Sequence, residues 1–361
     1  MISARRVTRA VHAGQVQIGG DAPISVQAMT KVRTGDIAAL VRQVGSLVRA
    51  GAEIVRFSIL DSSDLPAISA LKKRFDVPLV ADIHYDYRLA LAALDTGVDK
   101  LRVNPGNIRC PKLREVLSEA ARRKIPVRLG FNSGSLPEKK DGTLMPIVDF
   151  ASDIVRFCED CGFFDLVISL KTPSVGATLG AYRAFAVKCQ YPFHLGVTEA
   201  GSGLKGITKS VLGIGILLEE GIGDTIRVSL TGSPEEEVRV AKEILQVLGL
   251  RTFGPDIISC PTCGRCEVPL IKIALRMEKK ILTEAKKIPA IRRMKIALMG
   301  CGVNGPGEAK QADIGIAGGR QKFALFKKGK IIGTYPEDEI EQRFFEHLQE
   351  MVHGESRIRK K

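Results

Sequence analysis

The strongest constraint on the fold of this 361-residue chain is a repeat of short apolar, β-branched runs separated by segments with helical periodicity. The expected strands are residues 24–29, 54–59, 78–84, 100–104, 126–132, 166–171, 194–199 and 225–231. The expected helices are residues 36–50, 64–74, 87–94, 112–123, 149–161, 175–188, 204–219 and 234–248. Eight consecutive β–α units predict a (β/α)₈ TIM barrel. The alternative is an open, doubly wound sheet, which usually has fewer strands.

A second, smaller unit follows the last of these repeats. Residues 249–258 leave the barrel through glycine and proline, and the region beyond them mixes helical and strand patterns. Its expected helices are residues 267–282 and 336–352, and its expected strands are 294–299, 312–317, 322–326 and 331–334. We therefore expect a substrate-binding barrel over residues 1–250 and a metal-carrying α+β domain over residues 251–361. Residues 1–22 form a strand or a lid ahead of the barrel.

Cations recur where the expected barrel strands end. They are Arg56, Arg102, Arg128, Lys171 and Arg227. Catalytic groups of TIM barrels lie at this end of the strands, and a buried guanidinium without a counter-ion is costly. One interpretation pairs each cation with a carboxylate such as Glu53, Asp82 or Asp99. Five cations exceed the acids available, so we expect an anion, and arginine binds phosphate in a bidentate manner. The sequence therefore predicts a phosphorylated substrate.

Other polar residues share these strand ends and complete the expected substrate site. They are Asp82, His84, Asn104, Asn132 and Ser229. Glu199 also ends a strand, and a carboxylic acid among cations is a candidate proton donor. The alternative for Glu199 is an ion pair with Lys205 or Lys209.

Two glycine- and proline-rich loops carry cysteines at metal-ligand spacing. The first is Cys260-Pro-Thr-Cys263-Gly-Arg-Cys266, and the second begins at Cys301 and ends on Glu308. Three thiolates and one harder ligand suit an iron–sulfur cluster or a zinc ion. On spacing alone Cys266 competes with Cys263 as a ligand. The alternative is that these cysteines are buried thiols without a metal, but glycine- and proline-rich loops are poorly suited to filling a core.

Net charge and composition narrow the classes of partner. A net charge of +14 is compatible with nucleic-acid binding. The low aromatic content of 5%, with no tryptophan, and the placement of arginines in strands instead favour an anionic small substrate. No apolar run is long enough to span a membrane. The basic N-terminus lacks the apolar core of a signal peptide, so the eight cysteines indicate a reducing, cytoplasmic location.

The motifs together resemble one family, 4-hydroxy-3-methylbut-2-enyl diphosphate synthase, over nearly the whole chain. The motifs that carry the resemblance are residues 18–30, 102–107, 196–201, 260–265 and 301–308. The family consists of iron–sulfur oxidoreductases of the methylerythritol phosphate route to isoprenoids. The length matches its bacterial two-domain type.

The resemblance implies a reaction, a cofactor and partners. A TIM barrel would bind 2-C-methyl-D-erythritol 2,4-cyclodiphosphate, with Lys209 and Asn304 added to the substrate contacts. A [4Fe-4S] cluster, ligated by Cys260, Cys263, Cys301 and Glu308, would supply two electrons for ring opening. Reduced flavodoxin or ferredoxin would be the electron donor, and two chains would form a homodimer with a shared active site, without nucleic acid or membrane. This sequence departs from the family at Cys266 and at residues 31–34.

Overall fold

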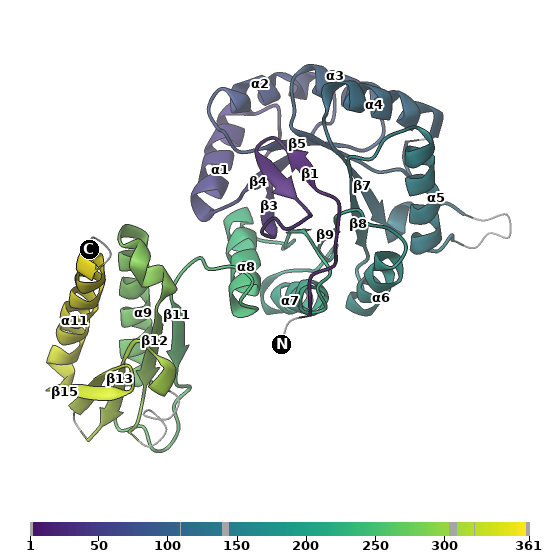
Figure 1. Ribbon diagram of the computed structural model, residues 1–361. Coiled ribbons are helices and arrows are strands. Elements are labelled where there is room, and N and C mark those ends of the chain that lie inside the picture. The colour runs from purple at the N-terminus through teal and green to yellow at the C-terminus, as the bar shows by residue number, and fades with distance from the viewer. Residues whose placement is uncertain (1–2, 109, 139–143, 303–308, 321, 359–361) are drawn as a thin grey trace. The chain divides into compact units, whose positions relative to one another are not determined.

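The computed structural model describes residues 3–108, 110–138, 144–302, 309–320 and 322–358 (Figure 1). The chain divides into two compact units, Met1–Arg251 and Thr252–Lys361.

The first unit is an eight-stranded parallel sheet surrounded by helices. Its strands are β3 (Ser25–Met29), β4 (Ile54–Ser58), β5 (Leu79–Ile83), β6 (Lys100–Val103), β7 (Val127–Asn132), β8 (Leu166–Lys171), β9 (His194–Leu195) and β10 (Thr225–Ile226). The sheet order is β8-β7-β6-β5-β4-β3-β10-β9. A parallel bridge between Ile168 and Phe193 joins its two ends. The predicted (β/α)₈ barrel is confirmed, and the open doubly wound sheet is excluded.

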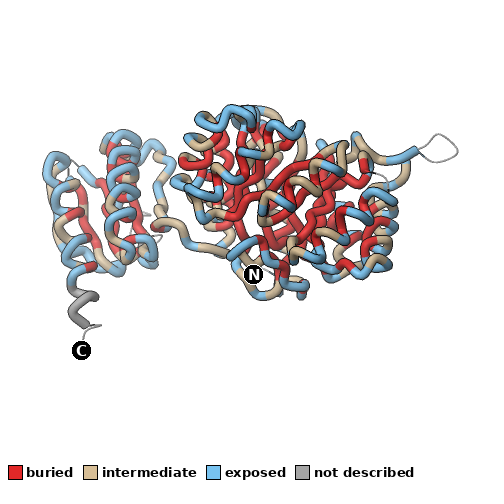
Figure 2. The backbone as a smooth tube through the Cα atoms, turned by 90° about the horizontal axis from the view of Figure 1, so that it is seen from above, coloured by how far each residue is buried: buried red, intermediate tan, exposed pale blue. Residues whose placement is uncertain are grey.

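The surrounding helices begin and end on the signals that their sequences carry. They are α1 (Ile37–Ala50), α2 (Pro66–Lys72), α3 (Tyr87–Asp95), α4 (Cys110–Arg123), α5 (Ile147–Asp160), α6 (Val175–Ala186), α7 (Gly203–Glu219) and α8 (Pro234–Val247). Asp36 caps α1 by accepting from the Ala39 amide, and Gly51 ends it with φ of 104°. Ser233 caps α8 ahead of Pro234. Figure 2 shows the buried strands enclosed by these half-exposed helices.

Two barrel strands are shorter than the sequence predicts. The expected strands 194–199 and 225–231 form ladder pairs only over His194–Leu195 and Thr225–Ile226. One further backbone bond, from the Arg227 amide to the Leu195 carbonyl, extends this pairing. Beyond it, Glu199 has a φ of 52°, which no extended strand can contain. The residues after β9 and β10 are therefore loops above the barrel.

The N-terminal segment closes the end of the barrel at which the strands begin. β1 (Val11–Ala13) and β2 (Val16–Ile18) form an antiparallel hairpin. Hairpin side chains pack in one cluster with Ile54, Val80 and Val167, which lie near the starts of their strands. The expected lid is therefore a plug at the end opposite the predicted catalytic face.

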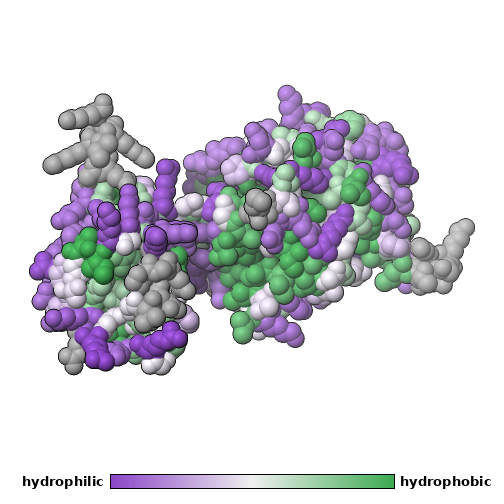
Figure 3. Space-filling model, turned by 60° about the horizontal axis from the view of Figure 1, so that its bottom comes forward, coloured by the Kyte–Doolittle hydropathy of each residue, from purple (hydrophilic) through white to green (hydrophobic). Residues whose placement is uncertain are grey.

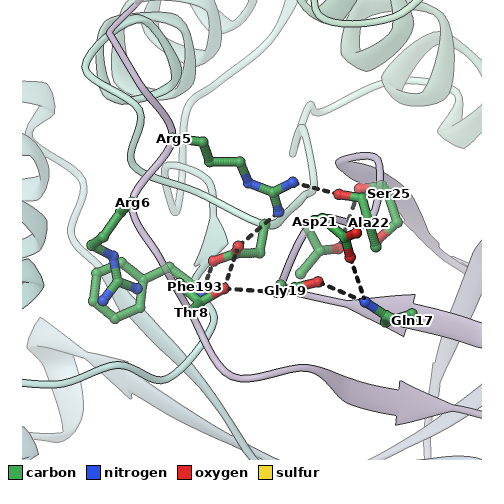
Figure 4. Close-up of polar contacts among 12 residues, drawn as sticks. Arg5, Arg6, Thr8, Gln17, Gly19, Asp21, Ala22, Ser25 and Phe193 are labelled. Atoms are coloured by element: carbon green, nitrogen blue, oxygen red, sulfur yellow. Dashed lines mark hydrogen bonds and ion pairs between the residues drawn. The ribbon is translucent and has the colours of Figure 1, made fainter.

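A buried carboxylate ties this segment to the barrel (Figure 4). Asp224 accepts from Arg5 Nη2 at 2.7 Å, from Thr8 Oγ at 3.0 Å and from the Phe193 amide at 2.7 Å. The Arg6 guanidinium lies 4.0 Å from the centre of the Phe193 ring and donates to the Tyr191 carbonyl. These contacts hold the N-terminal segment against strands β9 and β10.

The second unit is a five-stranded sheet with helices on one face. Its strands, in sheet order, are β11 (Asp256–Ser259), β12 (Lys295–Met299), β13 (Ile314–Gly319), β14 (Lys322–Lys327) and β15 (Lys330–Pro336). Helices α9 (Leu270–Lys287) and α11 (Glu337–Ile358) share one apolar core with this sheet. The predicted α+β unit is confirmed. Strand β11 was not predicted, because its four residues follow directly on the Gly-Pro linker.

Within the described residues, no helix has the combination of length and apolar character needed to cross a membrane.

Candidate active site

The barrel interior is lined by charged side chains near the ends of its strands. Side chains alternate along a strand, so residues two apart on β4 to β8 share the inner face. Five predicted site residues on these strands are at most 7% exposed. They are Arg56, Asp82, Arg102, Arg128 and Lys171. The sequence prediction that these groups converge on one region is supported by their mutual contacts.

Asp82 is the carboxylate that holds this cluster together. Its Oδ1 lies 3.0 Å from Arg102 Nη1, and its Oδ2 lies 3.6 Å from Arg56 Nε. His84 Nε2 lies 3.5 Å from Asp82 Oδ2 and 2.9 Å from Arg102 Nη1. Burial acts to raise the pKa of Asp82, but the two guanidinium groups outweigh it and hold that pKa well below its usual range. Asp82 is therefore ionised and neutralises part of the cationic cluster.

Among the described residues, no carboxylate forms an ion pair with the other inner cations. Arg128 is 2% exposed, and its Nε and Nη1 atoms have no hydrogen-bond partner among the described residues. Lys100 Nζ and both ring nitrogens of His194 are also buried and unpartnered within that part of the chain. Burial first, and neighbouring cations second, lower the pKa values of Lys100, Lys171 and His194 well below their ordinary values. The interior therefore has an excess of hydrogen-bond donors over acceptors.

Two glycines make room for cations that cross the barrel. A Cβ atom on Gly130 would lie 2.6 Å from Arg102 Nε, and one on Gly196 would lie 2.6 Å from Lys171 Nζ. Gly130 lies on β7, next to the strand that carries Arg102, and Gly196 follows β9, next to the strand that carries Lys171, so a side chain at either position would displace the charged group. The glycines therefore belong to the site, because they let long cationic side chains lie flat against the sheet.

The remaining predicted substrate contacts lie around the same end of the barrel. The Asn132 amide, oriented to satisfy both its oxygen and its nitrogen, accepts from Arg102 Nη2 at 3.2 Å. Asn104 donates to Ser135 Oγ at 3.0 Å and accepts from the Gly106 amide, so it organises the loop after β6. Arg227 and Ser229 are half-buried beyond β10. Lys209, on α7, lies 3.5 Å from the carbonyl of Pro173, just after β8.

Glu199 lies in the loop after β9 and is exposed. No hydrogen bond or ion pair joins it to Lys205, Lys209 or any other described residue, so the alternative of a structural ion pair is wrong for this state. Its φ of 52° is uncommon for a residue with a side chain, and such strain clusters at functional sites. Among the described residues, Glu199 is thus an exposed carboxyl group without a partner, on the loop after β9.

The first cysteine loop starts at the carboxyl end of a strand. Cys260 follows β11, and its amide donates to the Leu298 carbonyl of the parallel neighbour β12. Cys301 follows the end of β12, so both thiols lie at the same end of two adjacent strands. Cys260 Sγ accepts from the Thr262 amide at 3.4 Å, and Cys263 is exposed. These positions fit the chemistry of a thiolate-ligated iron–sulfur site.

Cys266 has a different environment from the other two cysteines of its loop. Its Sγ donates to the Val268 carbonyl at 3.3 Å. A Cβ atom on Gly300 would lie 2.7 Å from the same sulfur, so the thiol packs closely against that backbone. The Cys266 thiol therefore has backbone contacts that the structure does not give to the Cys263 thiol.

Two predicted site residues, Asn304 and Glu308, lie outside the described residues. Across the described part of the chain, no three His, Cys, Asp or Glu side chains form a preassembled metal-binding group.

Lys100 and His194 are interior residues that the sequence reasoning missed. The available signal was the period-two alternation of strands: Lys100 lies two residues before Arg102 on β6, so both face inward. His194 is the first residue of β9 and belongs to no motif of charged residues, so no sequence pattern marked it as a site residue.

The fold and the site together define a class: a TIM-barrel enzyme with a buried cluster of cations inside the barrel, joined to a cysteine-bearing α+β domain. Comparison with known proteins identifies the family. The family model described as GcpE TIM-barrel domain matches residues 8–242, and that described as GcpE protein C-terminal domain matches residues 256–350.

Curated relatives carry one name, 4-hydroxy-3-methylbut-2-en-1-yl diphosphate synthase (flavodoxin). The relative from Ruminiclostridium cellulolyticum is 50% identical over 353 residues, which cover 96% of this chain and 98% of that protein. The relative from Caldanaerobacter subterraneus is 46% identical and covers 98% of this chain and 100% of its own. The relative from Lawsonia intracellularis is 47% identical, with coverage of 97% and 98%. The chain belongs to this enzyme family.

Proposed function

We propose that the barrel binds 2-C-methyl-D-erythritol 2,4-cyclodiphosphate and that the chain converts it reductively to 4-hydroxy-3-methylbut-2-enyl diphosphate. The observation that carries this proposal is the excess of buried cations over carboxylates in the barrel interior. Asp82 is engaged by Arg56 and Arg102, whereas Arg128 keeps two unpartnered nitrogens. A diphosphate supplies the missing acceptors, and the names of the relatives contain a diphosphate product.

The chain's own residues bind, orient and protonate the substrate. Arg128 and Lys171 hold phosphoryl oxygens, and the Asp82 network fixes the guanidinium planes of Arg56 and Arg102 before substrate arrives. Ring opening leaves its phosphoryl oxygen in the diphosphate, and Glu199 gives its proton to the C3 hydroxyl oxygen, which departs as water; the conversion takes two electrons and two protons in all. The position of Glu199 on the loop after β9 allows it to approach substrate without competing for an internal partner.

A [4Fe-4S] cluster, ligated by Cys260, Cys263, Cys301 and Glu308, supplies two electrons to this reaction when it is bound. Glu308 would be the one oxygen ligand of the set, harder than a thiolate and held less firmly by iron. The hydrogen bond from Cys266 to Val268 supports leaving that thiol out of the ligand set. In this proposal residues 1–250 bind the substrate and residues 251–361 bind the cluster.

The proposed partners are a flavodoxin or a ferredoxin as electron donor and a second copy of the chain. The relatives' printed names specify flavodoxin. Helix α7 presents an apolar outer face, with Leu204 81%, Val211 42% and Leu212 45% exposed. Figure 3 shows apolar side chains gathered over this side of the barrel unit. A homodimer that covers this face explains its composition. All eight cysteines are free, which favours a cytoplasmic location.

One experiment on anaerobically purified protein tests the function. The wild type should show the visible charge-transfer absorption of an iron–sulfur protein, which zinc lacks, and should turn over the cyclic diphosphate with a chemical reductant. Serine variants at the proposed thiolate ligands should lose the absorption, while Cys266→Ser should keep it. The thiolate variants are Cys260→Ser, Cys263→Ser and Cys301→Ser.

The substrate site is tested in the same preparation. Arg128→Met should raise the Michaelis constant for the cyclic diphosphate by about 10- to 150-fold, the value of one lost charge-assisted hydrogen bond of ~1.5–3 kcal/mol. The matched control is Arg122→Met, which removes an exposed guanidinium paired with Glu119 on α4. Equal Michaelis constants for the two variants would refute the assignment of the barrel interior.

A further inference from the structure

One face of the second unit's sheet is covered by α9 and α11, whereas the other face carries a smaller apolar cluster that includes Ala317 and Phe326. On the covered face, Ile316, Phe323 and Leu325 pack in the core formed with α9 and α11. Side chains alternate along a strand, so Ala324 and Phe326 of β14 lie on the opposite face. There a pocket of about 310 Å³ is lined by described residues of β13, β14 and β15 together with Gly302. Ile331, which also lines it, is 65% exposed.

Positive charge surrounds this apolar pocket. Residues 310–330 contain six Lys and Arg residues but only one acid, Asp313. Arg320 and Lys322 line the pocket, and both are exposed. Lys310 packs against the β14–β15 turn, where a Cβ on Gly329 would lie 3.3 Å from its Cγ, and Lys328 forms that turn.

The nearby carboxylates do not cancel this charge. Asp313 Oδ2 accepts from the Lys295 amide at 2.8 Å, so it is engaged by backbone. Glu267 lies 3.8 Å from Arg320, in a pair whose side chains are 52% and 93% exposed. Exposed pairs of this kind contribute little and are screened by salt. The pocket and its basic rim therefore form one apolar, electropositive surface.

This surface adjoins the second cysteine loop. Gly302, which lines the pocket, directly follows Cys301. Gly318, another lining residue, is so close to the end of β12 that a Cβ there would lie 2.8 Å from the Gly300 carbonyl oxygen. A protein bound in the pocket would therefore lie against the backbone that carries a proposed cluster ligand.

We propose that this basic pocket, defined by Arg320, Lys322, Lys328 and Ile331, is the docking surface for an acidic electron-carrier protein. The inference rests on the proposed function, because it assigns a place to the electron donor. An acidic partner is steered to the surface by its positive field, and an apolar group of that partner enters the pocket. Redox partners form small, transient interfaces of this kind, typically below about 1,200 Å².

The net charges of the two units favour an acidic carrier protein over a second copy of the chain as the partner that binds in this pocket. Residues 252–361 carry 21 Lys and Arg against 13 Asp and Glu, and residues 1–251 carry 33 against 27. Both units are therefore net basic, so a second copy offers this basic rim less charge complementarity than an acidic partner does, and the apolar face of α7 remains the surface proposed for the homodimer.

The test measures the binding of flavodoxin and then compares turnover with two different electron donors. The probe is an acidic flavodoxin in its oxidised form, and its binding to the anaerobically purified holoprotein is measured by biolayer interferometry at low and high salt. The patch variant is Lys322→Glu with Lys328→Glu. The control variant is Lys272→Glu with Lys279→Glu, which makes the same charge change on exposed positions of α9. Turnover is then measured with reduced flavodoxin and, separately, with dithionite.

The patch variant should bind flavodoxin at least about tenfold more weakly at low salt, whereas the control variant should lose much less. The turnover of the patch variant with dithionite should stay at the wild-type value. The flavodoxin concentration that this variant needs for half-maximal turnover should rise in parallel with its loss of binding. Ile331→Ser should weaken binding at both salt concentrations, because it removes apolar contact and no charge.

Three results would overturn the surface assignment. These are equal flavodoxin binding by the patch and control variants, no flavodoxin binding by the wild type, or a patch variant that changes from dimer to monomer in sedimentation. The last result would assign the pocket to a second copy. Loss of the proposed function is a separate outcome, recognised when wild-type protein with an intact visible spectrum fails to convert the cyclic diphosphate with either reductant.

Discussion

The charge balance of the barrel interior makes Asp82→Asn the most informative substitution. Asp82 is 2% exposed and contacts Arg102 at 3.0 Å and Arg56 at 3.6 Å. Asparagine keeps the size and one acceptor oxygen but removes the negative charge. The variant therefore leaves two buried guanidinium groups without the carboxylate that contacts both of them.

The expected cost follows from this geometry. Removing one partner of a buried ion pair destabilises a protein by about 3–5 kcal/mol, because the remaining charge is uncompensated. For a unit of this size, 1 kcal/mol corresponds to roughly 2–4 °C. Asp82→Asn should therefore lower the unfolding temperature of the barrel by roughly 6–20 °C. Glu220→Gln is the control, because it breaks an exposed pair with Arg183 and should cost at most about 1 kcal/mol.

Ligand and pH distinguish lost charge from lost packing. Thermal unfolding is followed by circular dichroism with and without inorganic pyrophosphate, which should stabilise Asp82→Asn more than wild type, since it replaces the missing anion. The pKa of Asp82 is depressed in the folded state, so its contribution is present above about pH 4 and is lost as pH falls through the folded pKa. The difference between variant and wild type should shrink over that acidic range.

The reasoning would be refuted if Asp82→Asn unfolded within about 2 °C of wild type near neutral pH. It would also be refuted if pyrophosphate stabilised both proteins equally, because the inner cations would then have another counter-ion.

Three further predictions concern the same site. Glu199→Gln should keep the visible spectrum and the Michaelis constant but lower the turnover number by about 10²-fold, as expected for a lost general acid; near-normal turnover would remove Glu199 from the mechanism. Gly196→Ala should raise the Michaelis constant strongly and lower the unfolding temperature, because its Cβ would lie 2.5 Å from the Arg227 carbonyl oxygen and 2.6 Å from Lys171 Nζ, whereas Gly180→Ala, with open space on α6, should change neither. Substrate binding should take up protons over the pH range in which Lys171 titrates, because burial lowers the pKa of this lysine and a bound anion favours its charged form; titration calorimetry across pH, in buffers of different ionisation enthalpy, measures this, and zero uptake at every pH would contradict it.

Local pattern determined much of the architecture. The alternation of short β-branched runs with helical periods predicts the barrel, because each β–α unit is specified by its own spacing of apolar residues. Cations at the ends of strands predict an anion site, since parallel strands bring their carboxyl ends to one edge of the barrel. The Cys260 and Cys301 loops likewise carry their metal chemistry in residue type and spacing.

Tertiary structure decided which of these groups pair and which remain without a partner. Arg56, Arg102 and Arg128 are alike as sequence features, yet Asp82 contacts the first two directly and Arg128 keeps unpartnered nitrogens. Strand spacing could not reveal this, because it depends on how far each side chain reaches across the closed sheet. The burial of the His194 ring inside the barrel could not be predicted for the same reason.

The two cysteine pairs of the first loop show the same limit on a smaller scale. Cys260 with Cys263, and Cys263 with Cys266, have identical spacing, so sequence alone leaves the choice of ligands open. In the structure the Cys266 thiol donates to the Val268 carbonyl and packs against Gly300. Residue type determined that a soft-metal site could form in this loop. The folded backbone gives the three thiols different surroundings, because hydrogen-bond partners are set by position in space and not by distance along the chain.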